Sequence, residues 1–158
     1  MFNGAFTETL LLGGLAAILV VAAAIDVRTF TISNKLNLTV ALLAPLYWLA
    51  VALPLWPDVG LQLAAGAGVF VLFAGAFYAG MMGGGDVKLA AALALWFSPL
   101  STIKFLVLTS LAGGVLTLGI LAWHRLRRRQ GRPEIPYGVA IAFGGLAILT
   151  QRFLNQFA

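Results

Sequence analysis

The feature that most constrains this chain is a series of six apolar runs that together take up most of its 158 residues. About 20 consecutive apolar residues suffice for a helix to cross the hydrocarbon core of a bilayer. In lipid every backbone amide and carbonyl must find a partner within the protein, so such runs form helices. They cover residues 6–25, 36–53, 61–82, 89–97, 103–123 and 137–149. The sequence therefore predicts an all-α, polytopic membrane protein with about six transmembrane helices.

The composition excludes the other broad classes of chain. Apolar residues make up 61% and charged residues 9%, whereas soluble domains average about 45–50% and about 25%. The mean hydropathy is +1.00. An ordinary soluble globule, a disordered chain and a coiled coil are all excluded. Because six spans nearly exhaust the chain, we expect residues 1–158 to form a single integral membrane domain, with no separate soluble domain.

The basic residues predict the orientation, since short cytoplasmic loops carry an excess of Lys and Arg. With the N-terminus outside the cytoplasm, only Lys104 and Arg152 of the ten basic residues fall on the outer side. The same clustering explains the net charge of +5 without a nucleic-acid partner. Four tryptophans fall near predicted span ends, where interfacial anchors are expected: Trp48, Trp56, Trp96 and Trp123. The eight inner basic residues are Arg28, Lys35, Lys88, Arg125, Arg127, Arg128, Arg129 and Arg132.

The chain lacks the residues that several kinds of catalytic site require. The chain has no cysteine and one histidine, His124, which lies in a basic run typical of a membrane anchor. It has no zinc-protease motif, no serine-hydrolase motif and no phosphate-binding glycine loop. We therefore expect neither a metal nor a cofactor.

Two of the five acidic residues occupy unusual positions. Asp26 ends the first apolar run, and Asp86 follows three glycines just before a fourth run of only nine residues, 89–97. In the orientation above both lie at the cytoplasmic face. An ionisable residue at membrane depth is costly and marks a functional site by default. Solvated loop acids or helix caps would also fit the spacing, and we expect Asp86 to be the N-cap of a short fourth helix.

A pair of carboxylates in one cleft can hydrolyse an amide. At about 4 Å their repulsion amounts to about 4 kcal/mol at an effective dielectric near 20, which lets the pair share one proton near neutral pH. The ionised carboxylate then activates water, while the protonated one polarises the carbonyl and donates to the leaving amine. This route needs no metal and no nucleophilic side chain.

Three motifs, in order, resemble those of the type IV prepilin peptidases, a family of membrane aspartic proteases. The segment GGGDVKL at 83–89 resembles the family's Gly-x-Gly-Asp-x-Lys-Leu signature. Asp26 with ISN at 32–34 is similar to the first family aspartate and its downstream Ile-Pro-Asn. PYGVA at 136–140 is similar to the Pro-Tyr-Gly-x-Ala segment that opens the last helix of the family. The resemblance implies that Asp26 and Asp86 are catalytic, without deciding which is the base.

The resemblance also implies a substrate and a location. The substrate would be a type IV prepilin or pseudopilin, cleaved before its apolar helix at the cytoplasmic face of a bacterial inner membrane. The sequence departs from the family at Ser33, which replaces the proline and leaves Ser33 or Asn34 to cap the second span. It also lacks the large insertion with paired cysteines that accompanies N-methylation. It looks like the short, peptidase-only members, including those of tight-adherence pili, so we expect cleavage without methyl transfer. The oligomeric state is left open.

Other residues of these motifs are candidates for supporting roles. Gly83, Gly84 and Gly85 would let the substrate backbone approach Asp86, or would act as a hinge. Lys88 would contribute positive charge near the site or extend to the lipid headgroups. Asn34 would form a hydrogen bond near Asp26 or cap a helix. The opening of the last helix would line the cleft, with Pro136 at its first position, through Pro136, Tyr137 and Gly138.

Three other functions are consistent with parts of the pattern. A preflagellin-type peptidase would share the motifs but act on a different substrate. A proton-coupled transporter would use two membrane carboxylates, yet would predict acids near mid-membrane and inverted repeats, which are not found. A purely structural membrane subunit would have no use for two interfacial acids.

Overall fold

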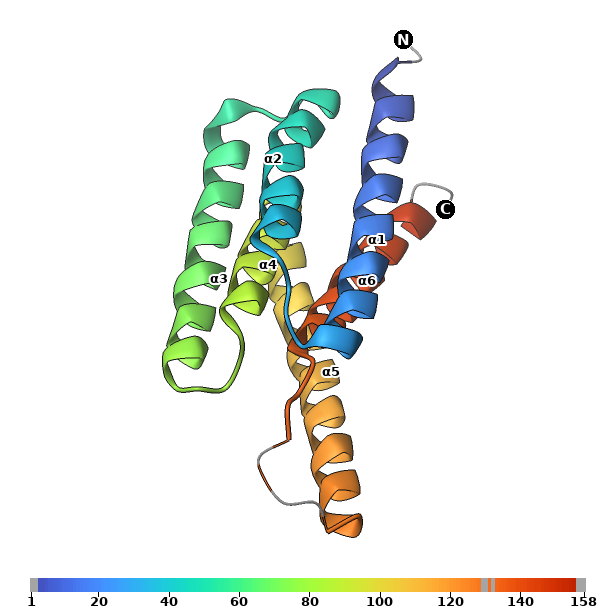
Figure 1. The fold of residues 1–158 in the computed structure, drawn as a ribbon. Coiled ribbons are helices and arrows are strands. Elements are labelled where there is room, and N and C mark those ends of the chain that lie inside the picture. The colour runs from blue at the N-terminus through green and yellow to red at the C-terminus, as the bar shows by residue number, and fades with distance from the viewer. Residues whose placement is uncertain (1–2, 129–130, 132, 156–158) are drawn as a thin grey trace.

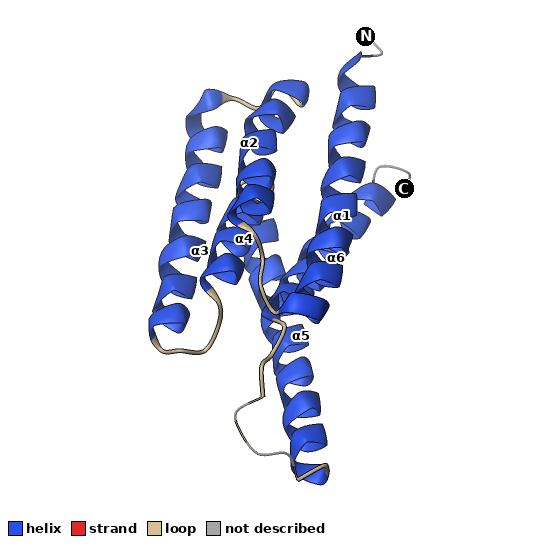
Figure 2. Ribbon diagram, viewed as in Figure 1, coloured by secondary structure: helices blue, strands red, loops and turns tan. Residues whose placement is uncertain are grey.

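The computed structural model describes residues 3–128, 131 and 133–155, and all regular structure within them is helical (Figure 2). The all-α prediction is thus confirmed. Arg129 and Arg132, counted above in the charge bias, lie outside the described residues. The elements in chain order are α1 (Asn3–Thr29), α2 (Asn34–Ala50), the irregular helical segment η1 (Leu55–Val59), α3 (Gly60–Tyr78), α4 (Gly84–Ala94), α5 (Pro99–Leu126) and α6 (Tyr137–Asn155).

Four helical segments are long and apolar enough to cross a bilayer: Gly4–Thr29, Leu55–Tyr78, Pro99–Leu126 and Tyr137–Asn155. A polytopic membrane protein is the fold class that these helices support. The helix α2 has 17 residues, about 26 Å, and α4 has 11, about 17 Å. The predicted short fourth helix is therefore present, and its length is well below the hydrocarbon thickness of about 30 Å. Six spans and an outer N-terminus stay predictions.

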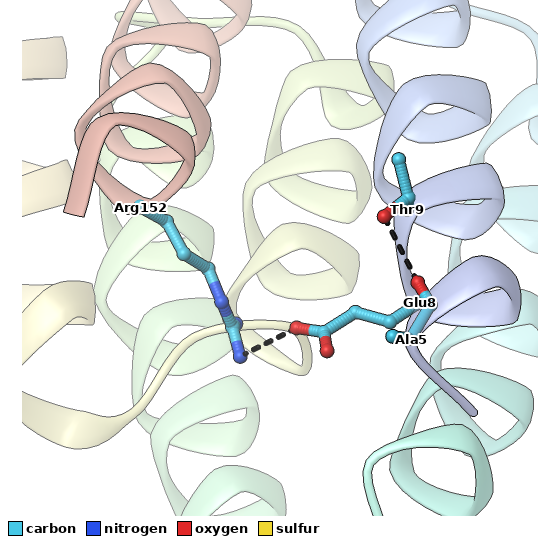
Figure 3. Close-up of polar contacts among 4 residues, drawn as sticks. All are labelled: Ala5, Glu8, Thr9 and Arg152. Carbon is cyan, nitrogen blue, oxygen red and sulfur yellow. Dashed lines mark hydrogen bonds and ion pairs between the residues drawn. The ribbon is translucent and has the colours of Figure 1, made fainter. Parts of the chain in front are cut away.

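The helices pack in two groups. In one, α4 packs against α2 and α3; in the other, α6 packs against α1 and α5. Contacts of α1 with α2 and of α4 with α6 join the groups. Both chain ends lie at the same end of the molecule, and α5 runs well beyond the other helices at the opposite end (Figure 1). Near the chain ends, Arg152 of α6 forms an ion pair of 3.5 Å with Glu8 of α1, beside the bond from the Thr9 hydroxyl to the Ala5 carbonyl (Figure 3).

The core is narrow, and many large apolar side chains remain on the outside, as in a protein solvated by lipid. Trp96 is buried completely and donates from Nε1 to the Val40 carbonyl. The prediction of an interfacial Trp96 is therefore wrong. The cause is the shortness of α4: the chain turns at residues 95–98 with Trp96 and Phe97 in the core, and carbonyls left free at the helix end need donors. Trp48 donates to one of them, that of Leu95, at 2.9 Å.

Candidate active site

Asp26 lies in the last turns of α1 and is 1% exposed. Its carboxylate points at the first turn of α6, where a Cβ on Gly138 would lie only 2.8 Å from Oδ2. The amides of Gly138 and Val139 face the same carboxylate, yet Oδ2 is buried and closes no hydrogen bond. The start of a helix favours a negative charge through its free amides. Asp26 is thus a buried acid with one oxygen available for another donor.

Asp86 lies in the first turn of α4 and is 7% exposed. Gly83, not Asp86, is the N-cap of this helix, so the expectation of an Asp86 N-cap is wrong. The helix begins two residues before Asp86 because the glycines themselves adopt helical geometry from Gly84 onward. The side chain reaches back instead: the Gly83 amide donates to Asp86 Oδ2 at 3.1 Å.

The two carboxylates act on one another. Burial, followed by the charge of Asp26, raises the pKa of Asp86 to about 6, while the hydrogen bond from Gly83 lowers it. Asp86 lies on α4, outside the helices of spanning length. The structure therefore brings together two acids that lie far apart in the sequence, one from each helix group. Such a pair can hold a single proton near neutral pH.

Lys88 and Asn34 pair with each other rather than with either aspartate. The Lys88 ammonium donates to Asn34 Oδ1 at 2.8 Å, joining the first turns of α4 and α2. Capping of α2 falls to Ser33, whose hydroxyl accepts from the Leu36 amide at 3.3 Å. Both Lys88 and Asn34 line a cavity of about 460 Å³ between α2, α3 and α4.

The three candidate residues at the start of α6 contact different parts of the molecule. Gly138 contacts the Asp26 carboxylate. The Tyr137 hydroxyl lies 3.3 Å from Thr117 Oγ1 of α5, and its ring lines a second cavity, of about 450 Å³, between α3, α5 and α6. Pro136 is buried and precedes the first residue of α6, so it does not occupy the first helical position. Neither aspartate lines either of these two cavities.

The three glycines before Asp86 differ in their surroundings. Gly83 is exposed, whereas a Cβ on Gly85 would lie 2.7 Å from the Ile32 carbonyl oxygen. The close approach at Gly85 in this structure is made by a loop of the protein itself, and a role of the glycines toward a substrate stays a prediction. Gly84 lies against the ring of Phe77, at ordinary contact distance for a Cβ.

Sequence reasoning missed two residues of the site. Asn37 is 4% exposed and donates from Nδ2 to the Gly85 carbonyl at 2.9 Å, directly before Asp86. Ile32, noticed only as part of a motif, lies between Gly85 and Gly138. A polar residue one turn into an apolar helix was the available signal for Asn37. For Ile32 no signal separated it from other apolar residues.

The acids and the single histidine do not gather into a metal site: no group of three potential ligands occurs in the described part of the chain. The chemistry that Asp26 and Asp86 themselves can supply is proton transfer by carboxyl groups. Water or an amide placed between them would meet one proton acceptor and one proton donor.

Comparisons with known proteins point to one family. The model of the type IV leader peptidase family matches residues 14–118, a range that includes both aspartates. Two prepilin leader peptidase/N-methyltransferases, from Burkholderia pseudomallei strains 1026b and K96243, are each 30% identical over 146 residues. The match covers 86% of this chain but 44% of each relative, so the chain spans less than half of their length. No solved structure matches.

Proposed function

Because the chain belongs to the type IV leader peptidase family, we propose that it is an aspartic endopeptidase that removes the leader peptides of type IV prepilins or pseudopilins. The observation that carries this proposal is the pair of buried acids, Asp26 and Asp86, one of which shifts the pKa of the other. Family membership supports the substrate class, and the similarity to prepilin leader peptidases supports leader cleavage.

In the proposed reaction the two acids share one proton before the substrate binds. The ionised carboxylate takes a proton from a water molecule, whose oxygen attacks the carbonyl carbon of the scissile bond. The protonated carboxyl donates its proton to the carbonyl oxygen, forming a tetrahedral intermediate. Collapse of that intermediate breaks the C–N bond: one of its two hydroxyl groups returns a proton to the second carboxylate, and the proton taken from water passes from the first carboxyl to the departing amine. The pair returns to its singly protonated state with no metal in the cycle.

We further propose cleavage at the cytoplasmic face of a bacterial inner membrane, with the domain spread over residues 1–158 and embedded in the bilayer. Arg28, Lys35 and Lys88 lie close to the aspartates along the chain, and the positive-inside rule supports their inner placement. Cleavage without N-methylation is also part of the proposal. Its support is the complete absence of cysteine, where the methylating members carry a paired-cysteine insertion.

A cleavage assay tests the function directly. Purified protein in detergent is incubated with a prepilin, and the release of the leader is followed for wild type, Asp26→Asn and Asp86→Asn. Both variants should lose at least about a thousandfold in rate, because each amide removes one half of the proton relay. Asp58→Asn in η1 is the matched control and should cleave normally.

The same assay separates the rival functions. A preflagellin supplied in parallel should be cleaved more slowly than the prepilin; the reverse preference would assign the chain to the preflagellin group. Failure of the wild type to cleave either substrate would favour a transporter or a structural subunit. Transfer of a methyl group from S-adenosylmethionine to the new N-terminus would contradict the peptidase-only proposal.

A further inference from the structure

Ile32 lies in the connection between α1 and α2, and only 7% of its surface is exposed. Connections normally run over the protein surface, because a buried loop must find partners for its backbone polar groups. The neighbours Thr31 and Ser33 follow that rule and are exposed. The inward position of Ile32 is therefore specific to this residue.

The backbone of Ile32 contacts the turn that carries Asp86. A Cβ added to Gly85 would lie 2.7 Å from the Ile32 carbonyl oxygen and 3.2 Å from its nitrogen. Real Cβ atoms do not approach backbone this closely, so the absence of a side chain at Gly85 is what admits the loop. The contact is one residue away from Asp86.

The side chain of Ile32 contacts the turn that holds Asp26. A Cβ added to Gly138 would lie 2.5 Å from Ile32 Cδ1 and 2.8 Å from Asp26 Oδ2. The tip of Ile32 and the Asp26 carboxylate therefore lie against the same point of α6. Since Gly138 and Asp26 belong to one helix group and Gly85 to the other, Ile32 touches both groups, each of which carries one of the two aspartates.

We propose that Ile32 is a positioning residue that sets the separation between the Asp26 and Asp86 carboxylates. The role in catalysis rests on the proposed peptidase function; the role in geometry does not. A β-branched side chain has few rotamers and serves as a stiff spacer. Because protein interiors are close-packed, adding or removing a single methyl group at this point shifts the neighbouring turns.

The separation matters because it determines how strongly the two acids share a proton. Near 4–5 Å, a change of 1 Å alters the gap between the two apparent pKa values of the pair by roughly half a pH unit. Within the described residues, Asp26 is the charged group that acts on Asp86 from another helix. Lys88, on the same helix as Asp86, is bonded to the neutral Asn34 amide.

The first experiment measures geometry without using activity. The chain contains no cysteine, so Asp26→Cys and Asp86→Cys can be introduced together into the full-length protein in membranes. Bifunctional thiol reagents of increasing length then report the separation. The spacer length that cross-links the two cysteines most efficiently should be shorter with Ile32→Val than with Ile32 intact, and longer with Ile32→Phe. Ile148→Val, the same change in a core residue of α6, should leave the preference unchanged.

The second experiment measures the pH profile of prepilin cleavage with both aspartates intact. Ile32→Val should widen the gap between the acidic and basic limbs, Ile32→Phe should narrow it, and both should lower kcat more than they change KM. If Ile32→Phe does not fold, the comparison of Ile32→Val with Ile148→Val decides alone.

The two experiments separate the two proposals. Identical cross-linking in the Ile32 and Ile148 variants would overturn the positioning role, whether or not the protein cleaves a prepilin. A shifted cross-linking preference in a protein that cleaves nothing would support the positioning role and count against the proposed peptidase function.

Discussion

At the scale of single residues, the site depends on what each carboxylate lacks as much as on what it contacts. Asp26 Oδ2 is buried without a hydrogen bond, and within the described residues Asp86 accepts a hydrogen bond from the Gly83 amide. A buried carboxylate with few donors is destabilised in its ionised form. Burial of Asp86 therefore costs free energy of folding wherever this acid is ionised.

The first prediction concerns the stability of Asp86→Asn. Because folding raises the pKa of Asp86 from 3.8 to about 6, this acid favours the folded state fully below about pH 4. The advantage is lost as the pH rises through about 6. At pH 8 the free energy of unfolding of Asp86→Asn should therefore exceed that of the wild type by up to about 3 kcal/mol. The variant should accordingly unfold at a higher temperature. Thermal unfolding in detergent at pH 4 and pH 8 measures this, and parallel pH curves would contradict it.

A second prediction concerns Gly138, against which two atoms of the site lie. Gly138→Ala adds a methyl group within 3 Å of both Ile32 Cδ1 and Asp26 Oδ2. We expect a loss of about 1–3 kcal/mol in stability and a strong loss of cleavage, because the Asp26 carboxylate must move. Gly114→Ala in α5 has open space around it and is the control. Equal effects of the two substitutions on melting temperature and cleavage would count against the prediction.

At the scale of elements, the short helix α4 decides where Asp86 lies. Two hydrogen bonds join its beginning to α2: Asn37 donates to the Gly85 carbonyl, and Lys88 donates to Asn34 Oδ1. Its buried end is closed by the Trp48 indole, which donates to the Leu95 carbonyl. A helix of 11 residues has little stability of its own, so its position depends on these ties and on packing.

A third prediction compares the two ties of α4 with α2. Asn37 is buried and Asn34 is exposed, so the same asparagine-to-alanine change should have unequal effects. Asn37→Ala should lower the free energy of unfolding by about 1–3 kcal/mol and should lower kcat, because the Gly85 carbonyl loses its buried hydrogen-bond donor. Asn34→Ala should cost less than about 1 kcal/mol, since water replaces the exposed bond. Chemical unfolding of both variants in micelles checks the order, and a larger effect at Asn34 would contradict it.

At the scale of the whole molecule, the arrangement in two groups places one aspartate in each. Asp26 is held by α1 and α6, and Asp86 by α4 with α2 and α3. Any movement of one group against the other changes the distance between the acids.

The fourth prediction tests the orientation of the molecule in the membrane. Since the chain has no cysteine, single cysteines can be introduced as Asp58→Cys in η1 and as Arg127→Cys after α5. In intact spheroplasts a membrane-impermeant maleimide should label the cysteine at position 58 at once. It should label the one at position 127 only after the membrane is opened. Labelling in the opposite order would invert the proposed topology and remove the aspartates from the cytoplasmic face.

The sequence by itself determined that the fold is helical and suited to a membrane, and it predicted which two acids form the site. Both follow from local properties, since hydropathy over a run of residues reports its solvent and a short motif reports its family. Only the tertiary structure decided that Trp96 is buried, that Asp86 follows the N-cap of α4, and that Asn37 and Ile32 belong to the site. These outcomes depend on which helix surfaces meet, and such contacts join residues that are distant in the chain and carry no local periodicity.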